Sequence, residues 1–72
     1  MLSDREIEVL KMINLTDDEI GDNLCISAST VKSHIHNIMD KLKVSTRANA
    51  VIAALKGKYI KVKDLKADYT KG

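Results

Sequence analysis

Residues 16–42 read TDDEIGDNLCISASTVKSHIHNIMDKL, and this stretch decides the fold. Thr16 and Glu19 have the spacing of a capping box, in which two side chains bind backbone amides at the start of a helix. They predict a helix over residues 17–24. Ser27 is a good N-cap residue for another helix, which would begin about three residues after the first one ends. Two helices separated by so short a turn are typical of a helix-turn-helix.

The second helix of this pair is expected to run from Ala28 to Leu42, because no helix breaker interrupts that stretch. At about 100° per residue, its apolar side chains gather on one side and must face the core; they are Val31, Ile35, Ile38 and Leu42. The opposite side is polar and consists of Ser29, Lys32, Ser33 and His36. Such groups can donate hydrogen bonds to DNA base edges or phosphates. Phosphates would repel the carboxylate of Asp40, so this polar surface should end before it.

The first helix is predicted from Ser3 and Glu6, which repeat the capping-box spacing. It should run from about Asp4 to Ile13, with apolar residues along one side at Leu2, Val9, Leu10 and Ile13. The chain has no proline and only three glycines, and no segment alternates apolar and polar residues as a half-buried strand would. The predicted fold class is therefore all-α.

A fourth helix follows the helix-turn-helix. We expect Ser45 to cap a helix from about Thr46 to Lys56, which Gly57 would end in a left-handed conformation. The four helices then form a compact four-helix bundle that contains the helix-turn-helix, and residues 1–57 make up the domain. Residues 58–72 are rich in lysine and weakly periodic, so we expect a flexible C-terminal tail.

Length and charge limit the possible functions. A chain of 72 residues can build only one domain, since it buries about 60% of its unfolded surface. The net charge of +2 is unevenly distributed: residues 1–24 carry two basic and seven acidic residues, whereas residues 25–72 carry ten basic and three acidic residues. This asymmetry predicts one surface that repels polyanions and another that attracts them.

Several function classes find no support in the sequence. No residues resemble a nucleophile with its base, and no glycine-rich loop could cradle a phosphate, so we expect neither an enzyme nor a small-molecule site in this domain. Cys25, His34 and His36 do not make a metal set, because residues two apart on a helix point in different directions. No cofactor is expected. We interpret Cys25 as a small buried hydrophobe and His34 as a half-buried packing residue.

The sequence also carries no sign of a membrane partner. No stretch approaches the roughly 20 apolar residues that cross a bilayer, and the first residues do not resemble a signal peptide. We therefore expect a cytoplasmic protein.

Short motifs spaced along residues 2–57 resemble the LuxR-type (GerE-like) helix-turn-helix DNA-binding domain. They are LSDRE at 2–6, EIG at 19–21, IS at 26–27, TVKSH at 30–34, NI at 37–38, KL at 41–42, and Arg47 with AV at 50–51. A series of matches at consistent spacing is more specific than a helix-turn-helix alone. The resemblance implies a DNA-binding domain of the kind found at the C-terminal end of response regulators in two-component systems.

The resemblance also implies roles for individual residues. By position, the side chains that approach base edges would be Lys32, Ser33 and His36. Phosphate contacts are implied for Ser27, Ser29, Thr30 and Asn37. The alternative is that Ser27 and Thr30 only cap the helix and that Lys32 is a solvated surface lysine. The resemblance also implies a structural role for residues at family positions that join the helices through polar contacts. These residues are Glu6, Glu19, Lys41 and Arg47.

Several positions depart from the family's pattern. Asn14 stands near a common glycine after the first helix, and asparagine tolerates positive φ. Gly21 replaces an alanine, at a cost of up to about 1 kcal/mol in a helix interior. Lys43 replaces a glycine and would need a strained left-handed conformation or a different turn. Asp17 and Asp18 replace polar or basic residues, so phosphate affinity through this helix should be weak.

The predicted fourth helix is apolar on nearly all sides over AVIAAL, residues 50–55, whereas a domain this small can cover only one side. Exposed apolar surface often marks an association site, and related domains dimerise through this helix. We therefore expect a homodimer interface that includes Ile52, Ala53 and Lys56. The alternative is that the small alanines serve only as good helix formers.

The sequence as a whole predicts sequence-specific binding of double-stranded DNA for regulation of transcription, with the helix from Ala28 to Leu42 in the major groove. Each protomer of the homodimer would read one half-site of a pseudo-palindromic operator. The alternative is a protein-interaction module that keeps the fold without specific DNA binding and uses its acidic second helix and apolar fourth helix.

Overall fold

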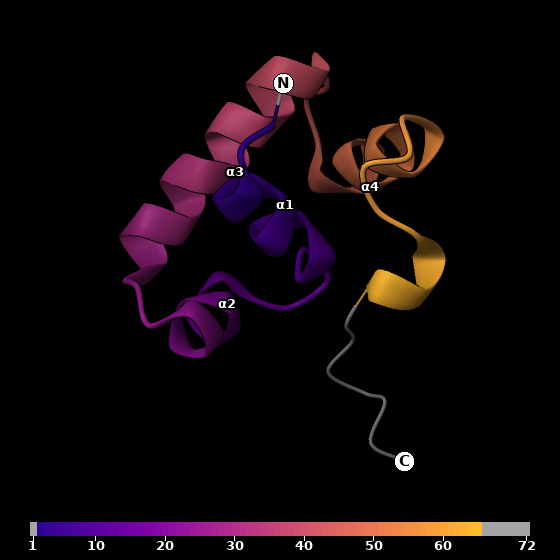
Figure 1. The fold of residues 1–72 in the computed structure, drawn as a ribbon. Helices are drawn as coiled ribbons and strands as arrows, with labels where there is room; N and C mark the ends of the chain where they lie inside the picture. Colours follow the sequence, from indigo (N-terminus) through magenta and orange to yellow (C-terminus); the bar gives the residue numbers. More distant parts are fainter. Residues whose placement is uncertain (1, 66–72) are drawn as a thin grey trace.

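The computed structural model describes residues 2–65 (Figure 1). In this part of the chain it contains four α-helices followed by one turn of 3₁₀ helix: α1 (Asp4–Lys11), α2 (Asp17–Leu24), α3 (Ala28–Leu42), α4 (Arg47–Lys56) and η1 (Val62–Asp64). The predicted all-helical fold class is confirmed. The bounds of α2 and α3 match the predicted ones, whereas α1 ends two residues before the predicted end and α4 begins one residue after the predicted start.

Each α-helix is directly preceded by an N-cap serine or threonine, whose side-chain oxygen accepts a hydrogen bond from the amide three residues further on. These residues are Ser3, Thr16, Ser27 and Thr46. The prediction that Ser45 caps the fourth helix is wrong, since the Thr46 Oγ1 accepts the bond from the Asn49 amide at 3.0 Å. Serine and threonine are both strong N-cap residues, so the local sequence does not choose between two adjacent positions.

The ends of α2, α3 and α4 each use a left-handed residue that is not glycine: Cys25, Lys43 and Lys58, with φ of 59°, 57° and 61°. After α3, the Lys43 amide donates to the Asp40 carbonyl and the Val44 amide donates to the Met39 carbonyl, which is a Schellman motif. Of the two alternatives for Lys43, the structure shows the left-handed conformation. A residue with a Cβ is strained there by roughly 1–2 kcal/mol.

Gly57 ends α4 differently from the prediction. Its φ is −81°, so the expected left-handed conformation is wrong; Lys58 takes that conformation one position later. The Lys58 amide donates to the Leu55 carbonyl and the Tyr59 amide donates to the Ala54 carbonyl. A Cβ on Gly57 would lie 2.9 Å from the Tyr59 ring. The glycine therefore makes room for an aromatic ring, which is a different reason for its presence.

The turn after α1 is made without a left-handed residue. Among residues 2–65, Asn14 is not one of those with positive φ, so its tolerance for that conformation is not used. The chain instead leaves α1 through tighter hydrogen bonds, from the Met12 amide to the Val9 carbonyl at 3.0 Å and from the Ile13 amide to the Leu10 carbonyl at 3.1 Å. Bonds of this span belong to a 3₁₀ turn.

Helix α3 is the central element of the fold and contacts α1, α2 and α4 (Figure 1). Its predicted core side is confirmed, since Val31, Ile35 and Ile38 are buried, while Leu42 is half-buried. The rest of the chain contributes the other buried apolar residues: Val9, Leu10, Ile13, Ile20, Ala50, Ala54 and Ile60. Burial of this apolar surface, at roughly 25 cal/mol per Å², holds the helices together.

Ile60 anchors the segment that follows α4, because its side chain is buried in the same core. Figure 1 shows the chain turning back from α4 toward η1. Ile60 lies within the segment 58–72 for which the sequence predicts a flexible tail, and its side chain is buried. Of that segment, residues 66–72 lie outside the described residues.

One polar contact joins α1 to the end of α3. The Lys41 Nζ donates to the Glu6 Oε1 at 2.9 Å, and the Ser3 amide donates to the same oxygen at 2.9 Å. The Lys41 ammonium, with the Ser3 amide, keeps the pKa of the buried Glu6 carboxyl below its usual value. This pair has the structural role that the resemblance implies for Glu6 and Lys41.

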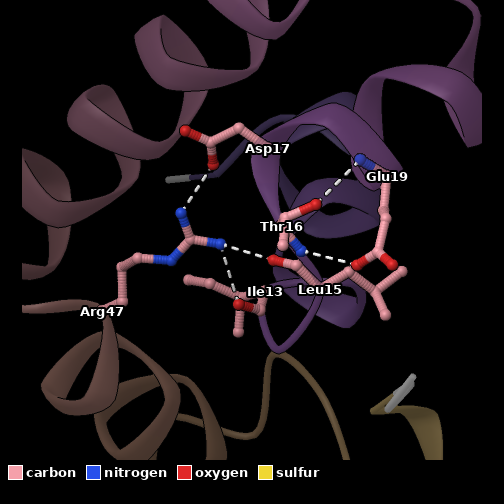
Figure 2. Close-up of polar contacts among 6 residues, drawn as sticks. All are labelled: Ile13, Leu15, Thr16, Asp17, Glu19 and Arg47. Carbon is pink, nitrogen blue, oxygen red and sulfur yellow. Dashed lines mark hydrogen bonds and ion pairs between the residues drawn. The ribbon is translucent and has the colours of Figure 1, made fainter. Parts of the chain in front are cut away.

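A second polar contact fixes the start of α4, as Figure 2 shows. The Arg47 Nη1 donates to the Asp17 Oδ1 at 2.6 Å, and its Nη2 donates to the carbonyls of Ile13 and Leu15, each at 2.9 Å. The predicted structural role of Arg47 is confirmed. Glu19 instead closes the capping box of its own helix, since its Oε1 accepts from the Thr16 amide.

Candidate nucleic-acid interface

The turn between α2 and α3 depends on the absence of a side chain at Gly21. The Ile26 amide donates to the Gly21 carbonyl at 2.9 Å, which folds the turn back on α2. A Cβ on Gly21 would lie 2.6 Å from the Ile26 carbonyl oxygen, closer than real Cβ atoms approach. The sequence predicts only a loss of helix propensity at this position. The structure shows in addition that glycine permits the close approach of α2 and the turn.

Cys25 is exposed, so the prediction of a small buried hydrophobe is wrong. Its backbone takes the left-handed conformation at the end of α2, with φ of 59°. The neighbouring Ile26 is the half-buried residue that packs against the core. The sequence alone does not show which of two adjacent apolar residues in a tight turn points inward, because the backbone conformation decides this.

The outer side of α3 is polar and exposed, as the sequence predicts. The exposed residues on it are Ser29, Lys32, Ser33, His36 and Asn37. The buried side of the same helix contains Val31, Ile35 and Ile38, at 0%, 4% and 0% exposure. Packing of one side thus orients the other, and the structure brings all three residues predicted to contact bases onto one solvent-facing surface. We call the exposed side of the stretch from Ser27 to Asn37 the reading face; its residues are Ser27, Ser29, Thr30, Lys32, Ser33, His36 and Asn37.

The N-terminal end of the reading face is held by its own hydroxyl groups. The Ser27 Oγ accepts a hydrogen bond from the Thr30 amide at 3.1 Å, and the two hydroxyl oxygens lie 3.0 Å apart. Both side chains are exposed. Capping therefore explains the presence of both residues. The positive end of the helix dipole lies at the same place and would attract an anion that approaches the start of α3.

The charges around the reading face vary along its length. Lys32 is the one charged residue in the stretch 27–37. The exposed Asp40 lies about one turn of helix beyond Asn37, where this stretch ends. The carboxylate of Asp17 is paired with Arg47, which reduces the repulsion of phosphates that the sequence predicts for it. Asp18 is exposed and retains that effect. Within the stretch 27–40 of α3 and its cap, a polyanion is therefore attracted most strongly near Lys32.

The outer side of α4 differs from that of α3. Ala50 and Ala54 are fully buried and define its core side. Ile52 is 49% exposed and Lys56 is exposed, while Ala53 is half-buried. The structure thus places two of the three predicted interface residues on the outer side of α4 and the third at its edge.

Three further expectations concern the burial of His34, metal binding and membrane-spanning helices. His34 is half-buried, as predicted. Within residues 2–65, no three His, Cys, Asp or Glu side chains are placed to hold a metal ion. Across the same residues no helix is both long enough and apolar enough to span a bilayer.

Two structural contacts are not predicted from the sequence, and they differ in whether the sequence carries a signal for them. The carbonyls of Ile13 and Leu15 that bind Arg47 are backbone groups, which carry no sequence signal. The packing of Ile60 has a weak one, since apolar residues recur in a lysine-rich segment at Tyr59, Ile60, Val62 and Leu65.

A short helix-turn-helix whose second helix shows a polar, weakly basic surface defines a class of nucleic-acid-binding domain. Residues 1–54 match the family model of bacterial regulatory proteins of the luxR family. The chain belongs to this family. It is accordingly a DNA-binding helix-turn-helix domain of the kind that regulates transcription.

The chain is also similar to individual proteins that are named as transcriptional or response regulators. The chain is 38% identical over 65 residues to the transcriptional regulatory protein DegU of Brevibacillus brevis, which covers 88% of this chain and 28% of the relative. It is 47% identical over 55 residues to the transcriptional regulatory protein LiaR of Bacillus subtilis, with coverage of 74% and 26%. It is 43% identical over 56 residues to the response regulator protein VraR of Staphylococcus aureus, with coverage of 75% and 27%. The chain therefore spans about a quarter of the length of these relatives.

Proposed function

We propose that α3 enters the major groove of double-stranded DNA and reads its sequence with the reading face. One observation carries this proposal: a helix packed tightly on one side exposes a continuous polar surface on the other. Base edges would be contacted by Lys32, Ser33 and His36, and phosphates by Ser27, Ser29, Thr30 and Asn37. The major groove, about 12 Å wide, admits an α-helix.

The reading face is too short to specify a long site alone. At about 3.6 residues per turn, the stretch from Ser27 to Asn37 covers only about three turns of helix. We therefore propose that each protomer reads one half-site and that a homodimer binds a pseudo-palindromic operator. The exposure of Ile52 and Lys56 supports an interface through α4, with Ala53 at its edge.

The likeness to longer regulators supports a proposal about the whole protein. We propose that residues 1–57, with the following segment attached through Ile60, form the DNA-binding domain of a cytoplasmic response regulator in a two-component system. In this role the domain has no enzymatic activity of its own. DNA is its partner, and control of its activity belongs to the rest of the protein.

A DNA-binding titration over a range of salt concentrations tests the proposal. We expect the affinity for duplex DNA to fall steeply as salt rises, because lysines that contact phosphates release counterions. Lys32→Ala should weaken binding to a selected site by roughly 1–3 kcal/mol, whereas Lys63→Ala, an exposed lysine in η1, should leave the affinity unchanged. The alternative, a protein-interaction module, predicts no binding of DNA even at low salt.

The proposed homodimer has its own test. Ile52→Glu should weaken binding to a full palindrome much more than binding to a single half-site, because it places a charge in the interface. Val62→Glu is the matched control, since Val62 is an exposed apolar residue outside α4. Equal losses on both DNA lengths with Ile52→Glu would contradict dimerisation through α4.

A further inference from the structure

A hollow of about 410 Å³ lies between the end of α4 and the segment that follows it. Its apolar lining comes from Leu55, Ile60 and Val62. Leu55 is half-buried and Ile60 is buried, so both are held in place by the core, whereas the Val62 side chain is 72% exposed. An apolar surface of this kind stays in contact with water unless a partner covers it.

The rim of the hollow is basic. Lys58 and Lys61 complete its lining, and both are exposed. Lys56 and Lys63 lie close by in the sequence and are exposed as well. The nearby carboxylate of Asp64 is half-buried and accepts a hydrogen bond from the Lys61 amide at 3.0 Å. The hollow thus combines an apolar floor with positive charge at its edge.

This combination distinguishes between possible occupants. In a twofold dimer through this patch, both protomers would bring the basic rim of Lys58 and Lys61 into one interface, where like charges disfavour association. DNA would be attracted by the lysines but offers the apolar floor nothing to bury, and Figure 1 shows η1 on the opposite side of the molecule from the N-terminal end of α3. A protein segment with carboxylates and aliphatic side chains satisfies both parts of the lining.

We propose that this hollow is a docking site for an acidic segment of another protein that carries aliphatic side chains. An aliphatic side chain would cover Leu55, Ile60 and Val62, while carboxylates would pair with Lys58 and Lys61. The site is separate from the reading face, so the domain can hold a protein partner while α3 is on DNA. The proposal does not depend on DNA binding and can be tested without it.

The test uses the full chain labelled with ¹⁵N and a synthetic peptide built from Glu, Leu and Ala as the probe. On titration we expect amide shifts confined to the region of Leu55, Ile60 and Val62. Two control peptides, one with Lys in place of Glu and one with Ser in place of Leu, should leave these amides unchanged. Shifts centred on α3, or equal shifts with either control peptide, would overturn the proposal.

Two variants and three competitors complete the test. Val62→Asp should weaken binding of the Glu-Leu peptide by about tenfold, whereas Ala48→Asp, at an exposed position in the first turn of α4, should leave the affinity for the peptide unchanged. Equal affinities in both variants would overturn the proposal. It would also be overturned if a DNA duplex displaced the peptide, if the same amides shifted with protein concentration alone, or if removal of residues 66–72 strengthened the binding of the peptide.

Discussion

Helices α3 and α4 differ in the size of the apolar side chains that they bury and in the side chains that they expose. Helix α3 buries Val31, Ile35 and Ile38 and turns polar groups toward solvent. Helix α4 buries two alanines, is fixed at its start by Arg47, and turns Ile52 toward solvent. The polar side of α3 is the surface proposed to contact DNA, whereas the exposed Ile52 of α4 is proposed to contact a second protomer.

The largest expected effect concerns the apolar attachment of α3. Ile38→Ala should destabilise the domain by about 2–5 kcal/mol, because it removes a fully buried side chain and leaves a cavity. Ile52→Ala, on the outer side of α4, should cost less than about 1 kcal/mol. Urea unfolding followed by circular dichroism gives both values. Similar losses in the two variants would show that α3 is not the more deeply packed helix.

The polar attachment of α4 should come next. Arg47→Ala removes hydrogen bonds to two carbonyls and to Asp17, and should cost about 2 kcal/mol, a figure already reduced for the partial exposure of the guanidinium. Arg47→Lys should recover only part of this, since an ammonium lacks the planar fork.

Arg5 provides the matched control for Arg47. It forms a surface pair with Glu8 at 3.5 Å, and both side chains are well exposed. Arg5→Ala should therefore change the free energy of unfolding by less than about 0.5 kcal/mol. If the two arginines proved equivalent in the same unfolding experiment, α4 would have to be held by its apolar contacts.

A smaller effect is expected where α3 passes into α4. Lys43 is left-handed, with φ of 57°, so Lys43→Gly should raise the free energy of unfolding by about 1 kcal/mol. Lys43→Ala keeps the Cβ and should bring no such gain. An equal gain from both variants would trace the effect to the lost charge.

The smallest expected effect is the pH dependence of the contact between α1 and α3. The pKa of Glu6 is lowered in the folded state by the Lys41 ammonium and the Ser3 amide, so its stabilising contribution is present above its unfolded pKa and is lost as pH falls through the lower folded value. The urea concentration at the midpoint of unfolding should therefore decrease as the pH falls below about 4.5. Glu6→Gln should reduce this decrease, because the amide has no proton to gain in this pH range.

The same contrast explains what the sequence can predict. The bounds of α2 and α3 follow from local signals, because Thr16, Glu19 and Ser27 act within their own helix turns. The polar reading face follows too, since a 3.6-residue period fixes which side of α3 is buried. The side chains proposed to contact DNA were therefore within reach of the sequence.

The region around α4 is less predictable because distant groups determine it. Arg47 binds carbonyls more than 30 residues earlier in the chain, and neither Ile13 nor Leu15 is marked as an acceptor by its side chain. The burial of Ile60 is likewise a tertiary contact. The local sequence also does not distinguish Ser45 from Thr46 as the cap, or Gly57 from Lys58 as the left-handed residue. Cys25 is mispredicted for a local reason, because its exposure accompanies a left-handed backbone.

In vitro selection of DNA from a random library, carried out in parallel with the wild-type chain and Lys32→Ala, tests most directly whether α3 reads bases. We expect two inverted half-sites for the wild type and a loss of preference at one base pair of each half-site for the variant. Identical selected sequences for the two proteins, with only a uniform loss of affinity in the variant, would contradict the assignment of Lys32 to base recognition. Failure of the wild type to enrich any sequence would contradict sequence-specific recognition of DNA by α3.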